Sequence, residues 1–316
     1  MRYVSLHSHS TFSYGDGYGT VEEHVDRVAS LGMKALALTD HGNTSSHVQL
    51  ERASKKHGIK PIFGCELYEA PTDPRSPEGL PIKTRKKYHQ TVLAADDEGL
   101  RNLNRIVSLS WAESFFQWPT ASARRLTEYS NGLIFLSGCS DSLLSCTLLG
   151  GKEKGDKKLA YTKRDFENAL RVIEWYQSFL GDRYYLEVQR FPRLDRTCVL
   201  NPAFSEMSRI TGARLVASSD VHYPLPEHND LQRILHAAHR GGTVESVDAT
   251  WEYDILLTYP TSDKEIFRDL VDTGLSDREA KSAILETERI AAQCNVVLPR
   301  NDPIEYPIDE EDWATW

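Results

Sequence analysis

Short apolar runs alternate along this chain with longer segments in which hydrophobic residues recur at helical spacing. In the first such segment, Thr20 and Glu23 have the spacing of a capping box. Val21, Val25 and Val28 in that segment fall on one helical face. The apolar runs are short, as strands of a buried sheet are. We predict seven strands, at residues 3–6, 35–38, 61–67, 88–94, 133–136, 184–188 and 215–217.

Helical segments lie between most of the predicted strands. One runs through Val48, Leu50 and Ala53 and stops near Gly58. Others are predicted at residues 99–111, 165–180 and 202–210. This alternation is typical of parallel strands with helices packed outside them, in a barrel or in an open doubly wound sheet. The predicted fold class is therefore α/β, and seven strands favour the barrel.

The chain changes in pattern beyond the last predicted strand. After Pro224 the pattern becomes helical and ends with a predicted helix at residues 277–295. We expect a barrel domain over residues 1–223, a helical extension packed on the barrel over 224–300, and an acidic tail over 301–316. Two loop insertions are predicted within the barrel, at residues 71–87 and 150–163.

Composition narrows the class of protein. The 316 residues are 40% hydrophobic and 26% charged, which is ordinary for a globular protein. With 37 basic and 46 acidic residues the net charge is −9, so any contact with nucleic acid must be local. The amino-terminal segment lacks the apolar core of a signal peptide, and no apolar run approaches about 18 residues. We expect a cytoplasmic protein, in the host cytoplasm if viral, with no membrane contact.

The five cysteines form an odd set without a CxxC pair. In a chain of this size they are expected to be free thiols in a reducing compartment. Four of them fit the role of small buried hydrophobic residues. Cys139 differs because it follows the fifth predicted strand.

Residues that can bind metals gather at the ends of the predicted strands. His7 and His9 follow the first strand, and Asp220 and His222 follow the last. Two residues at this spacing on an extended segment point to the same side, so each pair can hold one ion. The other candidates at or near strand ends are Asp16, Asp40, His41, Glu66, His89 and Cys139. The carboxyl ends of the strands are where an α/β barrel builds its site.

Not every one of these candidates has to be a ligand. Asp40 is equally suited to capping the helix that follows it. His89 stands at the beginning of its predicted strand, so we expect that strand to begin a few residues earlier. Five other histidines are expected to be core or surface groups, namely His47, His57, His228, His236 and His239. Neutral imidazoles, carboxylates and one thiolate together suit a divalent zinc, manganese or iron ion.

Six motifs of this chain resemble those of one protein superfamily. They are His7-Ser8-His9, Thr39-Asp40-His41-Gly42, Gly64-Cys65-Glu66, Tyr88-His89, Ser137-Gly138-Cys139 and Ser219-Asp220-Val221-His222-Tyr223. The series resembles the PHP (polymerase and histidinol phosphatase) superfamily. It is most similar to the PHP domain that begins the bacterial replicative DNA polymerase alpha subunit. The similarity extends from residue 2 to about residue 298. No polymerase palm follows, so we expect a free-standing PHP protein.

The resemblance implies a distorted (β/α)₇ TIM-like barrel with three divalent ions in a cleft at the carboxyl ends of the strands. One ion would be held by His7, His9, Glu66 and Asp220. A second would be held by His89 and Cys139, with Glu66 bridging the two ions. A third would be held by Asp16, His41 and His222. Every ligand position is filled in this sequence, which favours an active enzyme.

Four anionic ligands against three dications leave a net charge of roughly +2 at such a site, which attracts phosphate. Water between two ions is deprotonated near neutral pH, so a metal-bound hydroxide can hydrolyse a phosphoester. Glu66, Asp220 and Asp16 are the predicted catalytic carboxylates. We favour a DNA nuclease acting on single or double strands. Its predicted phosphate contacts are Arg190, Lys83, Arg85, Lys86 and Lys87.

Two other functions fit the same motifs. One is a small-molecule phosphatase of the histidinol-phosphate or nucleotide type, which requires a closed pocket. The other is a non-catalytic accessory module that docks on replication proteins through the region after Pro224. Exonuclease and endonuclease action, either polarity, and replication, repair or phage partners are all compatible with the sequence.

Overall fold

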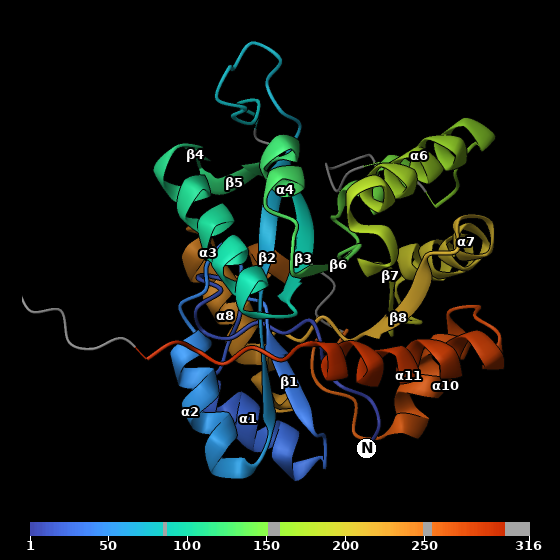
Figure 1. The fold of residues 1–316 in the computed structure, drawn as a ribbon. Coiled ribbons are helices and arrows are strands. Elements are labelled where there is room, and N and C mark those ends of the chain that lie inside the picture. Colours follow the sequence, from blue (N-terminus) through green and yellow to red (C-terminus); the bar gives the residue numbers. More distant parts are fainter. Residues whose placement is uncertain (85–86, 151–158, 249–254, 301–316) are drawn as a thin grey trace, which may run out of the picture.

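The computed structural model describes residues 1–84, 87–150, 159–248 and 255–300. Its centre is a curled sheet whose strands follow the order β4-β5-β2-β3-β6-β7-β8, with β1 paired to β2 (Figure 1). The strands are β1 (Ala35–Leu38), β2 (Lys60–Ala70), β3 (Tyr88–Ala94), β4 (Phe115–Phe116), β5 (Trp118–Ser122), β6 (Leu133–Leu136), β7 (Tyr184–Gln189) and β8 (Arg214–Ser218). The acidic tail predicted over 301–316 lies outside the described residues.

The amino-terminal segment closes the sheet into a barrel. Ser5 forms a parallel bridge with Leu36 of β1, and Ser8 forms one with Val221, just after β8. The backbone N–H of His9 donates to the carbonyl of Val221 at 2.7 Å. The segment predicted as the first strand therefore lies between β1 and the end of β8 and connects them. The predicted α/β barrel fold is confirmed, and six of the seven predicted strands are present. The segment predicted as the first strand forms isolated bridges instead of a strand, and β5 is an addition beside the carboxyl half of β2.

One strand runs against the expected direction. β3 begins at Tyr88, as predicted, but it is antiparallel to both β2 and β6. Its first residues therefore lie beside the carboxyl ends of its neighbours, and His89 pairs with Tyr68 of β2. The expectation that this strand begins earlier was wrong. Its direction explains why His89 shares an edge with the other candidates.

Helices cover the outside of the barrel (Figure 1). Those within residues 1–223 are α1 (Val21–Ser30), α2 (His47–His57), α3 (Asp97–Ala112), α4 (Ala123–Glu128), α5 (Leu143–Leu149), α6 (Lys163–Leu180) and α7 (Asp195–Thr211). The capping box of Thr20 and Glu23 is formed, and α2 ends at Gly58 in the left-handed conformation. The helix predicted from Pro202 begins earlier, at Asp195, so Pro202 lies inside α7.

The later helices are α8 (Asn229–His239), α9 (Val244–Asp248), α10 (Asp263–Asp272) and α11 (Asp277–Gln293). Short 3₁₀ turns lie at Gly181–Arg183 and Pro226–His228. Asp263 accepts hydrogen bonds from the backbone N–H groups of Arg2 and Tyr3, and Thr287 accepts one from Val4. Residues of α10 and α11 join the same apolar core as the strands. The region after Pro224 thus packs against the barrel and its amino-terminal segment.

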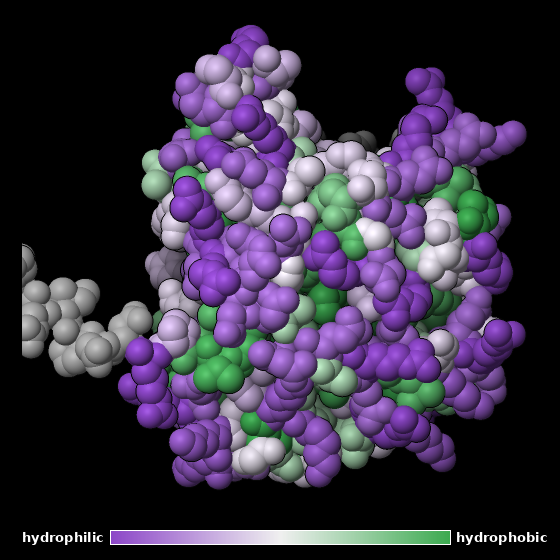
Figure 2. Space-filling model, viewed as in Figure 1, coloured by the Kyte–Doolittle hydropathy of each residue, from purple (hydrophilic) through white to green (hydrophobic). Residues whose placement is uncertain are grey.

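The surface agrees with the composition. The face in Figure 2 is mostly hydrophilic, with separate hydrophobic areas between charged side chains. Among the described residues, no helix is both long and apolar enough to cross a bilayer. The five cysteines, all within the described residues, form no disulfide bond with one another.

Candidate metal centre

The ends of the strands surround a cavity of about 760 Å³. Seven of the nine predicted metal ligands line it, namely Asp16, His41, Glu66, His89, Cys139, Asp220 and His222. His7 and His9 lie beneath them and are fully buried. The structure therefore brings all nine residues to one end of the barrel.

The Glu66 carboxylate is the centre of this group. It lies on β2, is 1% exposed, and faces imidazoles from three different segments. Its Oε1 is 3.4 Å from Nε2 of His7 and 3.2 Å from Nδ1 of His89. Its Oε2 is 3.2 Å from Nε2 of His9 and 2.9 Å from Nδ1 of His41. Four imidazoles thus converge on one carboxylate.

Asp220 lies across the group from Glu66. Its Oδ1 is 3.4 Å from Nε2 of His7 and 3.6 Å from Nε2 of His9. The backbone of Asp220 has φ 41°, an uncommon conformation for a residue with a side chain. Such strain persists where the surrounding structure holds it, frequently at functional sites. Here it accompanies the turn that brings Asp220 and His222 to the same cavity.

Asp16 and Cys139 complete the group on opposite sides. Oδ2 of Asp16 is 3.0 Å from Nε2 of His41 and 3.3 Å from Nε2 of His222. Sγ of Cys139 is 3.5 Å from Nδ1 of His89. Asp16 thus lies beside His41 and His222, and Cys139 lies beside His89.

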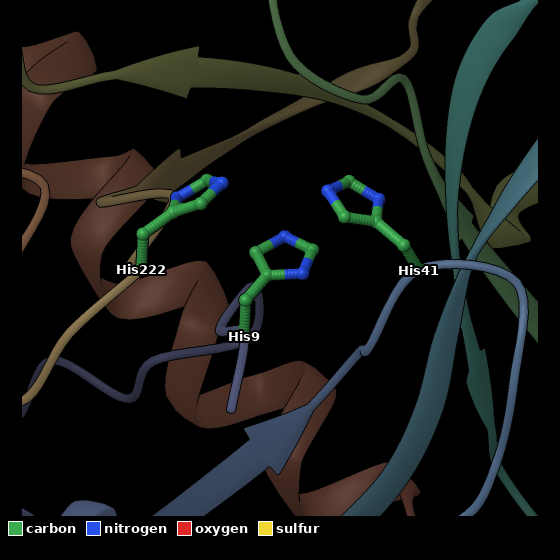
Figure 3. A group of neighbouring side chains, drawn as sticks. All are labelled: His9, His41 and His222. Atoms are coloured by element: carbon green, nitrogen blue, oxygen red, sulfur yellow. The ribbon is translucent and has the colours of Figure 1, made fainter. Parts of the chain in front are cut away.

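Within the part of the chain that the structure describes, three sets of side-chain atoms are close enough together to hold one ion each. They are His9, His41 and His222; His7, His9 and Glu66; and His41, Glu66 and His89. In Figure 3 the rings of the first set face one another from three separate segments. His41 thus lies close to Glu66 and His9 as well as to Asp16, so the sets share members.

Several buried polar atoms in this group have no hydrogen-bond partner. They are Nε2 of His7, Nε2 of His9, Nδ1 of His41 and Oε1 of Glu66. Buried polar atoms are normally paired, because an unpaired one costs desolvation free energy. All four atoms belong to the cluster around the Glu66 carboxylate. Imidazole nitrogen and carboxylate oxygen are ligand atoms suited to divalent ions. The residues present therefore fit the metal that the superfamily implies.

The imidazoles are oriented through their second nitrogen. Nδ1 of His7 is 2.7 Å from Oε1 of Glu187, a buried residue of β7. Nδ1 of His9 is 2.9 Å from Oγ of Ser13, and Nδ1 of His222 is 2.9 Å from the carbonyl of Asp220. Such contacts fix the ring and its tautomer in metal sites. The sequence alone does not single out Glu187, because its contact with His7 joins two segments that are far apart along the chain.

The charges of the group are mutually stabilised. Burial opposes ionisation of Glu66, but the imidazoles of His89, His7 and His41 lower its pKa well below the usual value. Burial would lower the pKa of His41, but Glu66 and Asp16 raise it to about 10. Without a metal ion, the protonated imidazole of His41 balances negative charge on Glu66 and Asp16. A metal ion must therefore compete with protons for these ligands.

Two residues have roles that the sequence did not reveal. Asp40 accepts hydrogen bonds from the backbone N–H of Ser10 at 2.7 Å and from Oγ of Ser13 at 2.9 Å. The expectation that Asp40 caps the following helix was wrong, because the N-cap of α2 is Ser46. His236, predicted to be a core or surface group, is 1% exposed and lies 2.6 Å from Oδ1 of Asp16. Only the packing of α8 could show this contact.

The predicted phosphate contacts divide into three groups. Lys87 lines the cavity, and Lys83 is exposed on the preceding loop. Arg85 and Lys86 lie outside the described residues. Arg190 instead pairs with Asp269 at 2.7 Å and with Glu265, both of α10. The structure therefore brings Lys87 to the cavity and Arg190 to the helical region.

The barrel with its ring of metal-binding residues defines the class of protein. A family model described as the PHP domain matches residues 5–191, more than half of the chain. The chain therefore belongs to the PHP domain family.

Particular relatives are DNA polymerase III alpha subunits. The protein of Treponema pallidum (strain Nichols) is 32% identical over 314 residues, which is 96% of this chain and 24% of that protein. That of Helicobacter pylori (strain J99 / ATCC 700824) is 27% identical over 307 residues, with the same coverage. The chain thus spans about a quarter of the length of these relatives. Among solved structures, an amidohydrolase from Chromobacterium violaceum has a TM-score of 0.45 at 17% identity, covering 70% of this chain and 88% of that one.

Proposed function

We propose that this chain is a metal-dependent phosphoesterase that hydrolyses the phosphodiester bonds of DNA. One observation carries the proposal: the nine candidate ligand residues gather at one end of the barrel, seven of them line the cavity, and four of their buried polar atoms have no hydrogen-bond partner. Three divalent ions, of zinc, manganese or iron, fit such a set. When bound, they would activate water for attack and neutralise charge on the phosphate.

We assign the nine side chains to three ions. His7, His9 and Asp220 would hold one ion, with Glu66 shared with the ion at His89 and Cys139. Asp16, His41 and His222 would hold the third. The buried carboxylates Glu66 and Asp220 keep their negative charge, because the pKa of each is lowered by the imidazoles around it despite burial. They can therefore bind cations across the neutral pH range.

DNA is the proposed substrate for two reasons. The relatives that match most of the chain are DNA polymerase alpha subunits. In addition, Lys87 brings a basic group to the cavity of a chain whose net charge is −9. Lys83, Arg85 and Lys86 would extend this basic track, and a DNA backbone is attracted to such a local concentration of positive charge.

A time course on DNA labelled at the 5′ or 3′ end tests the proposal. Single strands and duplex are incubated with metal-loaded protein, with Asp220→Asn as the inactive variant and His57→Ala as a matched surface control. We expect degradation by the wild type and the control, and at least a roughly thousandfold slower degradation by Asp220→Asn. The ladder from each label gives the polarity.

Two outcomes would replace the proposal. Hydrolysis of small phosphomonoesters with intact DNA would identify a small-molecule phosphatase. Metal-loaded protein that cleaves neither substrate would favour an accessory module, which fits relatives that are polymerase subunits. Equal cleavage by wild type and Asp220→Asn would show that the candidate centre does not perform the reaction.

A further inference from the structure

A row of aromatic rings leads from the candidate metal centre along the wall of the cavity. The Tyr68 ring is stacked on His41, with centroids 5.6 Å apart. Trp118 lies 5.2 Å from Tyr68 on the other side. Beyond it, His239 lies 6.4 Å from Trp118 and 5.2 Å from Tyr14. The aromatic row, as we name Tyr14, Tyr68, Trp118 and His239, lines the same cavity throughout.

Four separate segments supply these rings, and the local backbone allows the contacts. Trp118 begins β5 directly after Gln117, which has φ 64°. A left-handed conformation at a residue with a side chain costs free energy. It persists where the surrounding structure fixes the backbone, frequently at functional sites. At the other end of the row Gly15 has φ 79°, and a Cβ there would overlap the ring of His239. The row therefore depends on specific backbone geometry at both ends.

Two rings of the row are open to solvent. Tyr14 is 80% exposed and Trp118 is 38% exposed. Exposed aromatic rings offer flat faces on which other rings can stack. Cationic groups accompany them, since Lys87 and Arg240 line the same cavity. Grooves that combine aromatic faces with positive charge are the way proteins bind single-stranded nucleic acids.

We propose that the aromatic row is a stacking site for unpaired bases, which delivers a single strand to the metal centre. The bases would stack on Tyr14 and Trp118, and the backbone would lie toward Lys87. In a duplex the faces of the bases are covered by their neighbours, so the row favours single strands and frayed ends. This inference rests on the proposed nuclease function and adds the form of nucleic acid that the same site accepts.

The test separates stacking from charge. The probes are fluorescein-labelled phosphorothioate oligothymidylate of about 12 nucleotides, and an abasic oligomer of equal length and charge. Binding of each to metal-loaded protein is measured by anisotropy for wild type, Trp118→Ala, Trp118→Phe, Tyr14→Ala and Lys87→Ala. Ile210→Ala, which alters an exposed apolar residue outside the cavity, is the matched control.

Removal of a stacking ring should weaken oligothymidylate binding by about fivefold to a hundredfold per base. We expect this for Trp118→Ala and Tyr14→Ala, with abasic binding unchanged and most affinity retained in Trp118→Phe. Lys87→Ala should weaken both probes. Equal loss on both probes, or no loss, for Trp118→Ala and Tyr14→Ala would overturn the stacking site. Cleavage of ordinary DNA that persists in that case leaves the nuclease proposal standing, whereas stacking without any cleavage overturns only the nuclease proposal.

Discussion

The imidazole of His236 holds the carboxylate of Asp16 from the side opposite the candidate metal centre. Nε2 of His236 is 2.6 Å from Oδ1 of Asp16, while Oδ2 faces His41 and His222. Gln232, one turn earlier on α8, donates to the backbone carbonyl of Asp16 at 3.1 Å. A helix from the region after Pro224 thus positions a carboxylate that the barrel supplies.

Replacing His236 should therefore weaken metal binding without removing a ligand. We expect His236→Ala to lower the affinity for one ion by about tenfold to a hundredfold, as removal of an orienting partner does at other metal sites. His236→Gln, which keeps a donor, should lose less. Metal content is measured by mass spectrometry after equilibration with a competing chelator.

The control for this prediction is His57→Ala. His57 pairs with Asp26 at 2.8 Å on the surface and lies outside the cavity. Its replacement should leave metal content unchanged. If His236→Ala retained as much metal as His57→Ala at every chelator concentration, the contact with Asp16 would have no part in metal binding.

Much of the barrel could be predicted from local pattern. Strands of buried apolar residues have a recognisable length, so the run of apolar residues at 88–94 marks the bounds of β3 correctly. Its direction could not be predicted, because an apolar run has the same pattern in a parallel and an antiparallel strand. The hairpin of β4 and β5 was missed because its strands are short and partly exposed. That hairpin carries Trp118.

In the candidate site too, some features could be predicted from local sequence and others could not. Side chains at strand ends, such as His7 and Asp220, could be found because chain position alone places them at the edge of a barrel. Contacts between distant segments could not. Arg190 follows β7 as expected, but its pairing with Asp269 depends on how α10 packs. The role of His236 is hidden in the sequence because a single histidine in a helix has no distinguishing signal.

Glu69 should make the stability of the protein depend on pH. Burial raises its pKa from 4.5 to about 7, although the hydroxyl of Tyr176 donates to it at 2.5 Å. The folded state thus binds this proton more tightly than the unfolded state. Stability from this group is full below about pH 4.5 and is lost as pH rises through 7.

Glu69→Gln, which cannot ionise, should remove this dependence. The free energy of unfolding of the variant relative to wild type should increase between about pH 4.5 and 7, by on the order of 3 kcal/mol, and then level off. Urea unfolding at a series of pH values measures it. A difference between the two proteins that stays constant across this range would show that Glu69 does not titrate as inferred.

Gly64 of β2 is closely packed beneath the candidate metal centre. A Cβ on this residue would lie 2.7 Å from the carbonyl oxygen of Val92 and 2.8 Å from Cγ2 of Thr39. Gly64→Ala should therefore lower the free energy of unfolding by about 1–3 kcal/mol, as overpacking does. It should also reduce metal retention, because Glu66 lies two residues further along β2.

The comparison for this variant is Gly58→Ala. Gly58 has φ 66°, but a Cβ added there would meet no atom within 4 Å, so its replacement should cost about 1 kcal/mol through backbone strain alone. Metal retention should not change. If the two variants lost equal stability and kept equal metal, close packing at Gly64 would not support the position of Glu66.

Removing basic groups beside the cavity should weaken DNA binding and reduce its dependence on salt. Lys83 is exposed and Lys87 lines the cavity, so replacing both by alanine removes two charges from the proposed track. The slope of log affinity against log salt should become shallower by about 0.7 for each single-strand phosphate that is no longer neutralised. The control replaces Lys55 and Lys56, exposed residues of α2, and should leave the slope unchanged. Adding Arg85→Ala and Lys86→Ala should deepen the effect, whereas equal slopes for all variants would exclude this segment from DNA binding.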